Sequence, residues 1–232
     1  VTGTTYKSVI ITYDEKGNEL FKTYLSKTIA VDACVSPDNA EFAYAEVNNS
    51  GTTIQSNIKI ISIKDVKEKN TEPKYEYNAV QGSLILRIKY QDKSRLICMY
   101  DDSIHKFETG VDVELTKLNE DNPKITFADI ELSNYVFRTY EKSTSLFRAD
   151  TIIEMQNTSN GKENVYTIEE VAKSVVSNNN VIAVNLGNEV YFVETNAWLI
   201  KRYSSSQVIE KIILGDGVAG IIYSDKIEIV NL

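Results

Sequence analysis

The sequence predicts an all-β fold, and three observations support this prediction. Helical periodicity is nearly absent from the 232 residues. Short apolar segments rich in Ile, Val and Tyr instead alternate with polar turns, as strands and hairpins do. The same set of strands recurs about every 43 residues, a period typical of propellers with four-stranded blades. We therefore predict a β-propeller, or a large fragment of one, forming a single domain over residues 1–232.

Five hairpins are predicted to form the second and third strands of successive blades. Each joins two short apolar segments through a polar turn, and two of these turns are the dipeptides Gly187-Asn188 and Ser224-Asp225. The paired segments are 42–47 with 58–63, 96–100 with 104–108, 135–141 with 145–149, 181–186 with 189–193, and 218–223 with 226–230.

The other two strands of each blade flank these hairpins. An apolar segment before each hairpin is predicted to be the innermost strand, covered on both faces. These segments are 29–35, 84–90, 125–132, 171–176 and 208–214. More polar segments are predicted to form the outer edges, at 19–25, 75–80, 112–118, 164–168 and 198–203. A short helix over 168–176 is the alternative to a strand there, and loops are predicted at 48–57, 64–74, 119–124 and 157–162.

The predicted strands do not make a whole number of blades. The chain opens with a third and a fourth strand, at 9–13 and 19–25, and closes with a third strand at 226–230. We interpret this as a chain that begins in mid-blade, with five blades and an N-terminal half-blade, and with upstream strands and a membrane anchor outside it. A free-standing five-bladed propeller with an N-terminal hairpin is the alternative.

Composition excludes several classes of function. The chain has 25 Lys and Arg against 33 Asp and Glu, a net charge of −8, which repels polyanions and predicts no nucleic-acid partner. Its apolar runs are all shorter than the roughly 18 residues of a membrane span. Cys34 and Cys98 lie in strand-like segments without metal-knuckle spacing, so we predict buried thiols, with a disulfide as the alternative.

Motifs for cofactor or metal chemistry are weak. His105 is the only histidine, so a Ser-His-Asp triad would have to use it, and a His-rich metal site is excluded. We interpret His105 as a strand-face residue and predict no metal. Residues 215–220 match GxGxxG, but a strand follows instead of the helix that a dinucleotide needs. We interpret them as a glycine turn and predict no cofactor.

Acidic residues offer the one enzymatic alternative. Asp32, Asp129 and Glu210 lie on predicted innermost strands, where a carboxylate pair at a central channel would suit a glycosidase or lyase. Lys173 and Arg87 lie on the same class of strand, which favours a salt-bridged or solvated lining. Trp198, beside apolar residues, is predicted to pack in the fold rather than to bind a ligand.

Three segments carry a family resemblance. Residues 36–43 resemble the Ser-Pro-Asp-Gly-x-x-Leu-Ala turn of WD-like and TolB-like propellers, with Asn39 where Gly is usual. The stretch 13–17 resembles the end of a strand followed by Asp and Gly in the same repeats. Residues 221–229 are similar to the C-terminus of an uncharacterised propeller family of Gram-positive bacteria, domain of unknown function 5711. The resemblance implies an N-terminal transmembrane helix ahead of the propeller and a location on the extracytoplasmic face of the cell membrane. It implies no chemistry.

We therefore predict a non-catalytic binding or scaffolding module, displayed at the cell envelope, with a protein or wall-polymer partner. A cytoplasmic assembly subunit is a further alternative, and it predicts a large apolar patch on one face. Binding residues usually lie on loops of a rigid scaffold. The candidates are Asn49, Gly51, Lys67 and Lys69.

Overall fold

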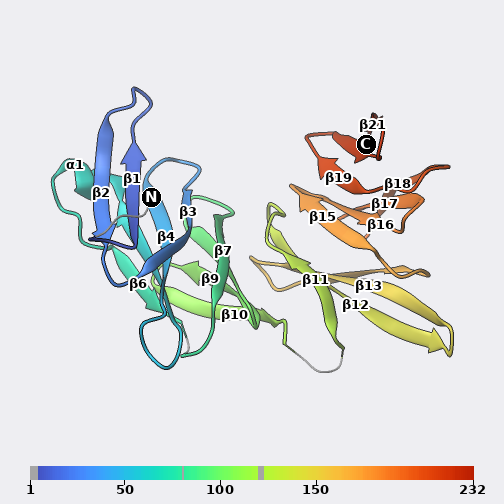
Figure 1. Ribbon diagram of the computed structural model, residues 1–232, viewed down its shortest axis with the longest axis horizontal. Helices are drawn as coiled ribbons and strands as arrows, with labels where there is room; N and C mark the ends of the chain where they lie inside the picture. Colours follow the sequence, from blue (N-terminus) through green and yellow to red (C-terminus); the bar gives the residue numbers. More distant parts are fainter. Residues whose placement is uncertain (1–4, 80, 120–122) are drawn as a thin grey trace. The chain divides into compact units, whose positions relative to one another are not determined.

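The computed structural model describes residues 5–79, 81–119 and 123–232. Within these residues it contains six antiparallel sheets, built from strands consecutive in sequence, and one short helix (Figure 1). The chain divides into two compact units, Val1–Lys117 and Leu118–Leu232, which are described separately here. The all-β prediction is confirmed, whereas a single domain that begins in mid-blade stays a prediction.

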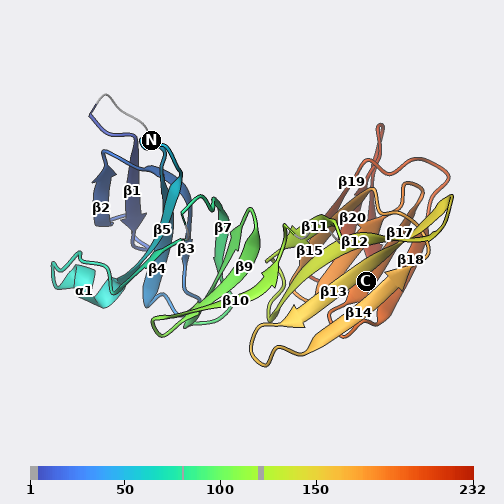
Figure 2. The same ribbon diagram turned by 90° about the horizontal axis from the view of Figure 1, so that it is seen from below.

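The first unit contains three sheets. A two-stranded sheet comes first, and the next two have four strands each, in sequence order. The strands are β1 (Ser8–Tyr13) and β2 (Glu19–Leu25), then β3 (Ile29–Val35), β4 (Glu41–Asn48), β5 (Gln55–Ser62) and β6 (Tyr75–Asn78), then β7 (Ile85–Tyr90), β8 (Arg95–Tyr100), β9 (Ser103–Glu108) and β10 (Val111–Lys117). The β3–β6 sheet packs between the other two sheets of this unit (Figure 2).

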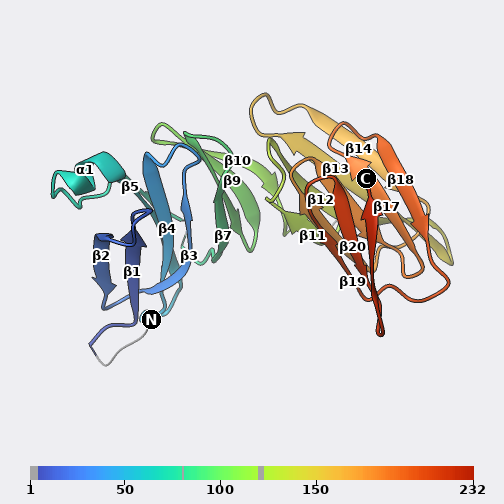
Figure 3. The ribbon, with the colours of Figure 1, turned by 90° about the horizontal axis from the view of Figure 1, so that it is seen from above.

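The second unit continues the pattern with two four-stranded sheets and a three-stranded one. The strands are β11 (Ile125–Asp129), β12 (Tyr135–Ser145), β13 (Arg148–Asn157) and β14 (Glu163–Ile168), then β15 (Ser174–Asn178), β16 (Val181–Asn185), β17 (Glu189–Glu194) and β18 (Leu199–Ser204), then β19 (Lys211–Leu214), β20 (Val218–Ile222) and β21 (Ile227–Asn231). The β15–β18 sheet packs between the other two sheets of this unit (Figure 3). No helix in the described part of the chain is long and apolar enough to cross a membrane.

In three sheets the second strand is the most buried one. Most residues of β4, β8 and β16 are inaccessible to solvent, because each of these strands has a hydrogen-bonded strand on both sides. The prediction that the first strands are covered on both faces is wrong for β3. There Val31 and Val35 are 40% and 52% exposed, because a first strand has a strand neighbour on one side only.

Several predicted boundaries move in the structure. The strands β15 and β19 begin three residues later than predicted, and no helix forms at 168–176. The predicted loop 64–74 is partly wrong because it contains the helix α1 (Ile63–Lys67), which begins where the Ser62 hydroxyl accepts a hydrogen bond from the Asp65 N–H. Residue 80 of the predicted strand 75–80 and residues 120–122 of the predicted loop 119–124 lie outside the described residues.

The largest correction concerns the hairpin of β12 and β13. The predicted strands were 135–141 and 145–149, with the polar residues 142–144 as the turn. In the structure both strands are longer, and Leu146 and Phe147 form the turn. The third strand is fixed by Ile153 and Met155, which are fully buried in the core of this unit.

Two predicted turns are confirmed. In the 36–39 turn, the Ser36 hydroxyl accepts hydrogen bonds from the N–H groups of Ala40 and Glu41. Asn39 has a φ of 54°, which explains an Asn where Gly is usual. In the 215–220 segment, residues 215–217 form the turn between β19 and β20, with Gly217 at a φ of 67°, and residues 218–220 begin β20.

Both cysteines are free thiols. Cys98 is buried as predicted, and Cys34 is partly exposed. Burial raises the pKa of the Cys34 thiol to about 12, and it raises the pKa of Cys98 well above its ordinary range. Both groups are therefore protonated and unreactive at neutral pH, as structural thiols are.

Candidate functional site

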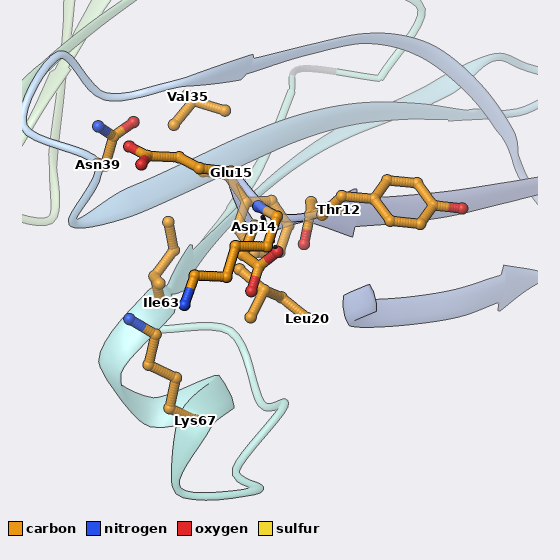
Figure 4. A pocket seen from close by; sticks show the side chains of 11 residues that line it. Thr12, Asp14, Glu15, Leu20, Val35, Asn39, Ile63 and Lys67 are labelled. Atoms are coloured by element: carbon orange, nitrogen blue, oxygen red, sulfur yellow. Dashed lines mark hydrogen bonds between the residues drawn. The ribbon is translucent and has the colours of Figure 1, made fainter. Parts of the chain in front are cut away.

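A pocket of about 410 Å³ lies in the first unit (Figure 4). Three segments that are far apart in sequence form it: the turn between β1 and β2, the 36–39 turn before β4, and α1. Its apolar lining comes from Leu20, Val35, Phe42 and Ile63. Its polar lining includes Glu15, Lys16, Asn39 and Lys67, and we call this site the β1–α1 pocket.

The β1–β2 turn is held by the carboxylate of Asp14. Its Oδ1 accepts the N–H groups of Lys16 at 2.9 Å and Asn18 at 2.8 Å, and its Oδ2 accepts the Asn18 side-chain amide at 2.8 Å. These hydrogen bonds, led by that of the Asn18 side chain, lower the pKa of Asp14 below its ordinary value. The Asp14 carboxylate is therefore engaged in shaping the turn, and the turn presents Glu15 and Lys16 to the pocket.

The pocket has a rigid apolar floor. Phe42 is 2% exposed and meets Phe21 edge to face, with 5.0 Å between the ring centroids. On the other side, the buried Val66 packs α1 against the same apolar cluster. Because its floor belongs to the core of the unit, the pocket is preformed.

The charges around the pocket are mainly unpaired cations. A neighbouring groove of about 350 Å³ shares Asn39, Ile63 and Lys67 with the pocket and adds Lys64 and Lys74. Lys74 pairs with Glu41 at 2.5 Å. Within the described residues, the ammonium groups of Lys16, Lys64 and Lys67 form no ion pair. Asp14 and Glu15 are the acidic residues that line the pocket, and Glu15 extends toward Asn39, away from Lys67 (Figure 4).

The four predicted loop residues do not form one site. Lys67 lines the β1–α1 pocket, and Lys69 follows α1 with a φ of 66°. Asn49 and Gly51 lie in the loop before β5, whereas α1 follows β5, so the length of this strand separates the two pairs. The Asn49 side chain accepts a hydrogen bond from the Lys7 ammonium at 3.1 Å.

Two of the three candidate channel acids connect neighbouring sheets. Asp32 on β3 accepts a hydrogen bond at 2.9 Å from the N–H of Ile88 on β7. Asp129 on β11 accepts one at 3.0 Å from the hydroxyl of Ser177 on β15. The two aspartates therefore have the same structural role, in different units. Glu210 precedes β19 and is exposed.

His105 takes part in a hydrogen-bonded chain with the spacing of a catalytic triad. Its Nδ1 lies 2.7 Å from Asp112 Oδ1, and its Nε2 lies 3.1 Å from the Ser103 hydroxyl. The Ser103 hydroxyl, however, donates to Asp102 Oδ1 at 2.8 Å, so its proton points away from His105. Ser103 is also only 6% exposed, so we interpret the chain as a structural connection across β9 and β10.

Replacing His105 by Ala is expected to lower the free energy of unfolding by about 1–2 kcal/mol, because Ser103 and Asp112 lose their partner. Urea unfolding of the variant and the parent chain measures the difference. A variant as stable as the parent would show that the hydrogen-bonded chain is not structural.

Trp198 is 70% exposed, so the prediction that it packs in the fold is wrong. It directly precedes β18 at the end of the β17–β18 turn, in which Ala197 has a φ of 65°. The described residues contain no group of three or more His, Cys, Asp or Glu side chains placed to hold a metal ion.

The whole chain, residues 1–232, matches the family described as "Family of unknown function (DUF5711)". The chain belongs to this family. No curated protein matches the sequence of this DUF5711 chain.

Solved structures similar to the DUF5711 chain are propellers. The β-propeller domain of the Trilobed protease from Pyrococcus furiosus has a TM-score of 0.59 and 12% identity, over 97% of this chain and 77% of that one. The Pan2 WD40 domain of Neurospora crassa has a TM-score of 0.51 and 8% identity, over 92% and 66%. A prolyl endopeptidase has a TM-score of 0.58 and 15% identity, over 94% of this chain and 34% of that one, so the DUF5711 chain spans about a third of its length. At these identities the likeness shows the propeller fold alone.

Proposed function

We propose that the DUF5711 chain is a non-catalytic binding module whose β1–α1 pocket receives an acidic protein segment carrying an apolar anchor side chain. The observation that carries this proposal is the apolar floor of Leu20, Phe42 and Ile63 beside the unpaired ammonium groups of the rim. The chain has a net charge of −8, so a local group of unpaired cations attracts acidic ligands that the rest of the surface repels.

The dimensions of the pocket suit a segment rather than a flat protein face. A volume of about 410 Å³ lies within the usual range for ligand pockets and accommodates a large apolar side chain. The neighbouring groove, which shares Lys67, offers room for the residues beside the anchor. Carboxylates next to the anchor would face Lys64 and Lys67, which would steer association and fix the orientation of the segment.

The placement of the candidate catalytic groups supports binding over catalysis. Asp32 and Asp129 accept hydrogen bonds that join neighbouring sheets, and the Ser103 hydroxyl donates to Asp102 rather than to His105. A nucleophile needs its proton directed to a base, and a general acid needs a carboxyl group that is free to reach the substrate.

Selection from a random peptide library tests the proposal. The parent chain is expected to enrich peptides in which Asp or Glu flanks a large apolar residue, and the Lys67→Glu variant is expected to lose this enrichment. Lys27→Glu is the matched control, because Lys27 is an equally exposed lysine in the connection between β2 and β3. Enrichment of basic or uncharged peptides, or equal enrichment by Lys67→Glu, would contradict the proposal.

We also propose that the module is displayed on the extracytoplasmic face of a membrane, with a wall polymer as an alternative ligand. The support for this location is the resemblance described above, whose members carry an N-terminal transmembrane helix. Fractionation of the organism's own cells, followed by protease treatment of intact protoplasts, tests it. A protein that is soluble and protected from protease would contradict the location without affecting the pocket.

A further inference from the structure

The hairpin of β12 and β13 ends in two large apolar side chains that contact almost nothing. Leu146 is 94% exposed and Phe147 is 95% exposed. The two strands have 11 and 10 residues, whereas β4 and β5 have 8 each. In Figure 1 this hairpin is drawn in yellow, and its tip extends beyond the other strands of its sheet.

The fold does not require Leu and Phe at this turn. Neither residue is among those described with a positive φ, and Gly, Asn, Asp or Ser are the usual residues of such turns. Both side chains add nothing to the core of the unit, which ends well before the tip. Two adjacent apolar residues kept in water at a turn therefore indicate a contact outside the chain.

The residues next to the tip are cationic and hydroxylated. Residues 142–148 include Lys142 and Arg148, three hydroxyl side chains and no carboxylate, in a chain with a net charge of −8. The nearest carboxylates are those of Asp150, directly opposite Lys142, and of Glu141 on the neighbouring position of β12, while Glu169 and Glu170 line a pocket with Arg148. The tip thus combines an apolar end with Lys142 and Arg148, a short cationic collar with carboxylates at its base.

The backbone of the tip is suited to a medium of low polarity. Strand pairing continues to Ser145 opposite Arg148, the residues that bracket the turn, with a register shift between Ser143 and Ser145. The Thr144 hydroxyl donates to the carbonyl oxygen of Arg148 at 3.3 Å, so this side chain also has a hydrogen-bond partner within the tip. Few polar groups would therefore lose a partner if the tip left water.

We propose that the β12–β13 tip inserts Leu146 and Phe147 into the interface of a phospholipid bilayer, with Lys142 and Arg148 at the level of the lipid phosphates. A convex tip exposed on all sides needs no preformed partner in a fluid interface, whereas a protein would need a pocket shaped around it. The cationic collar is complementary to phosphate. The proposal is independent of the β1–α1 pocket.

Flotation of the chain with vesicles of phosphatidylcholine and a minor fraction of phosphatidylglycerol tests the proposal. The parent chain is expected to float with the vesicles, and L146S/F147S is expected to lose binding by at least about tenfold. The control I227S/I229S removes two residues that are 64% and 70% exposed on β21, and it should float like the parent chain. A parent chain that does not float, or equal losses in both double variants, would overturn the proposal.

The single tryptophan provides a second measurement. In W198F/F147W, the one Trp lies at the tip, so its emission should shift to the blue on addition of the vesicles and be quenched by brominated lipid. Far-UV circular dichroism checks that the variants remain folded, which the exposure of the substituted residues favours. An unshifted emission, or a shift produced only by a protein partner, would overturn insertion into a bilayer.

Discussion

Replacing Phe192 by Ala is expected to lower the free energy of unfolding of the second unit by about 3–5 kcal/mol. Phe192 on β17 is fully buried between Ala183 on β16 and the apolar residues of β19–β21. Its removal leaves a cavity that the surrounding strands, held by their ladders, fill only in part. Urea unfolding followed by circular dichroism measures the loss.

Phe147→Ala is the matched control, because it removes the same atoms from a side chain that is 95% exposed. Its effect on the free energy of unfolding should stay within about 0.5 kcal/mol. Similar losses in the two variants would contradict the packing described for the second unit.

Replacing Lys59 by Met is expected to destabilise the first unit by about 2–4 kcal/mol. Glu46 is 3% exposed, and its carboxylate is held by the Lys59 ammonium at 2.8 Å and by the Thr28 hydroxyl at 2.8 Å. The variant leaves this buried carboxylate without its cation. We expect a smaller loss of stability than the largest values for broken buried ion pairs, because the Lys59 side chain is 23% exposed and water reaches the site.

A second substitution separates the lost charge pair from the lost packing of Lys59. In K59M/E46Q the buried group is neutral, so the double variant should recover a large part of the stability, as measured by urea unfolding. A double variant that is no more stable than Lys59→Met would show that Glu46 is not held by this pair.

The sequence predicted the hairpins best, because turn chemistry is local. Gly187-Asn188 joins β16 to β17, as the dipeptide indicated. Asn39 adopts the left-handed conformation that its place in the 36–39 turn required. These features depend on residues next to one another in the chain, so no knowledge of the packing was needed.

Features that depend on neighbouring sheets escaped prediction. The polar residues 142–144 were predicted as a turn, yet they continue β12, which pairs with β13 as far as Ser145 opposite Arg148. The apolar pattern of β3 indicated two covered faces, although Val35 is half exposed at the edge of its sheet. Trp198, beside Leu199 and Ile200, was predicted to be packed, but its side chain lies in solvent at the end of the β17–β18 turn.

The candidate site was only partly predictable for the same reason. Lys67 was singled out as a loop residue, but nothing in the sequence joined it to Lys16 or Phe42, which come from two other segments. The chain from Ser103 through His105 to Asp112 likewise forms because β9 and β10 lie side by side. Pairing of these strands was predictable, but the direction of the Ser103 hydroxyl was not.

The proposed binding of an acidic segment at the β1–α1 pocket depends on Lys67. The most direct measurement is the affinity of one enriched peptide for the parent chain, Lys67→Glu and Lys27→Glu, by fluorescence anisotropy. The account predicts that Lys67→Glu weakens binding by about tenfold or more, that Lys27→Glu leaves it nearly unchanged, and that added salt weakens binding to the parent chain. Equal affinities for the three chains, or binding insensitive to salt, would contradict it.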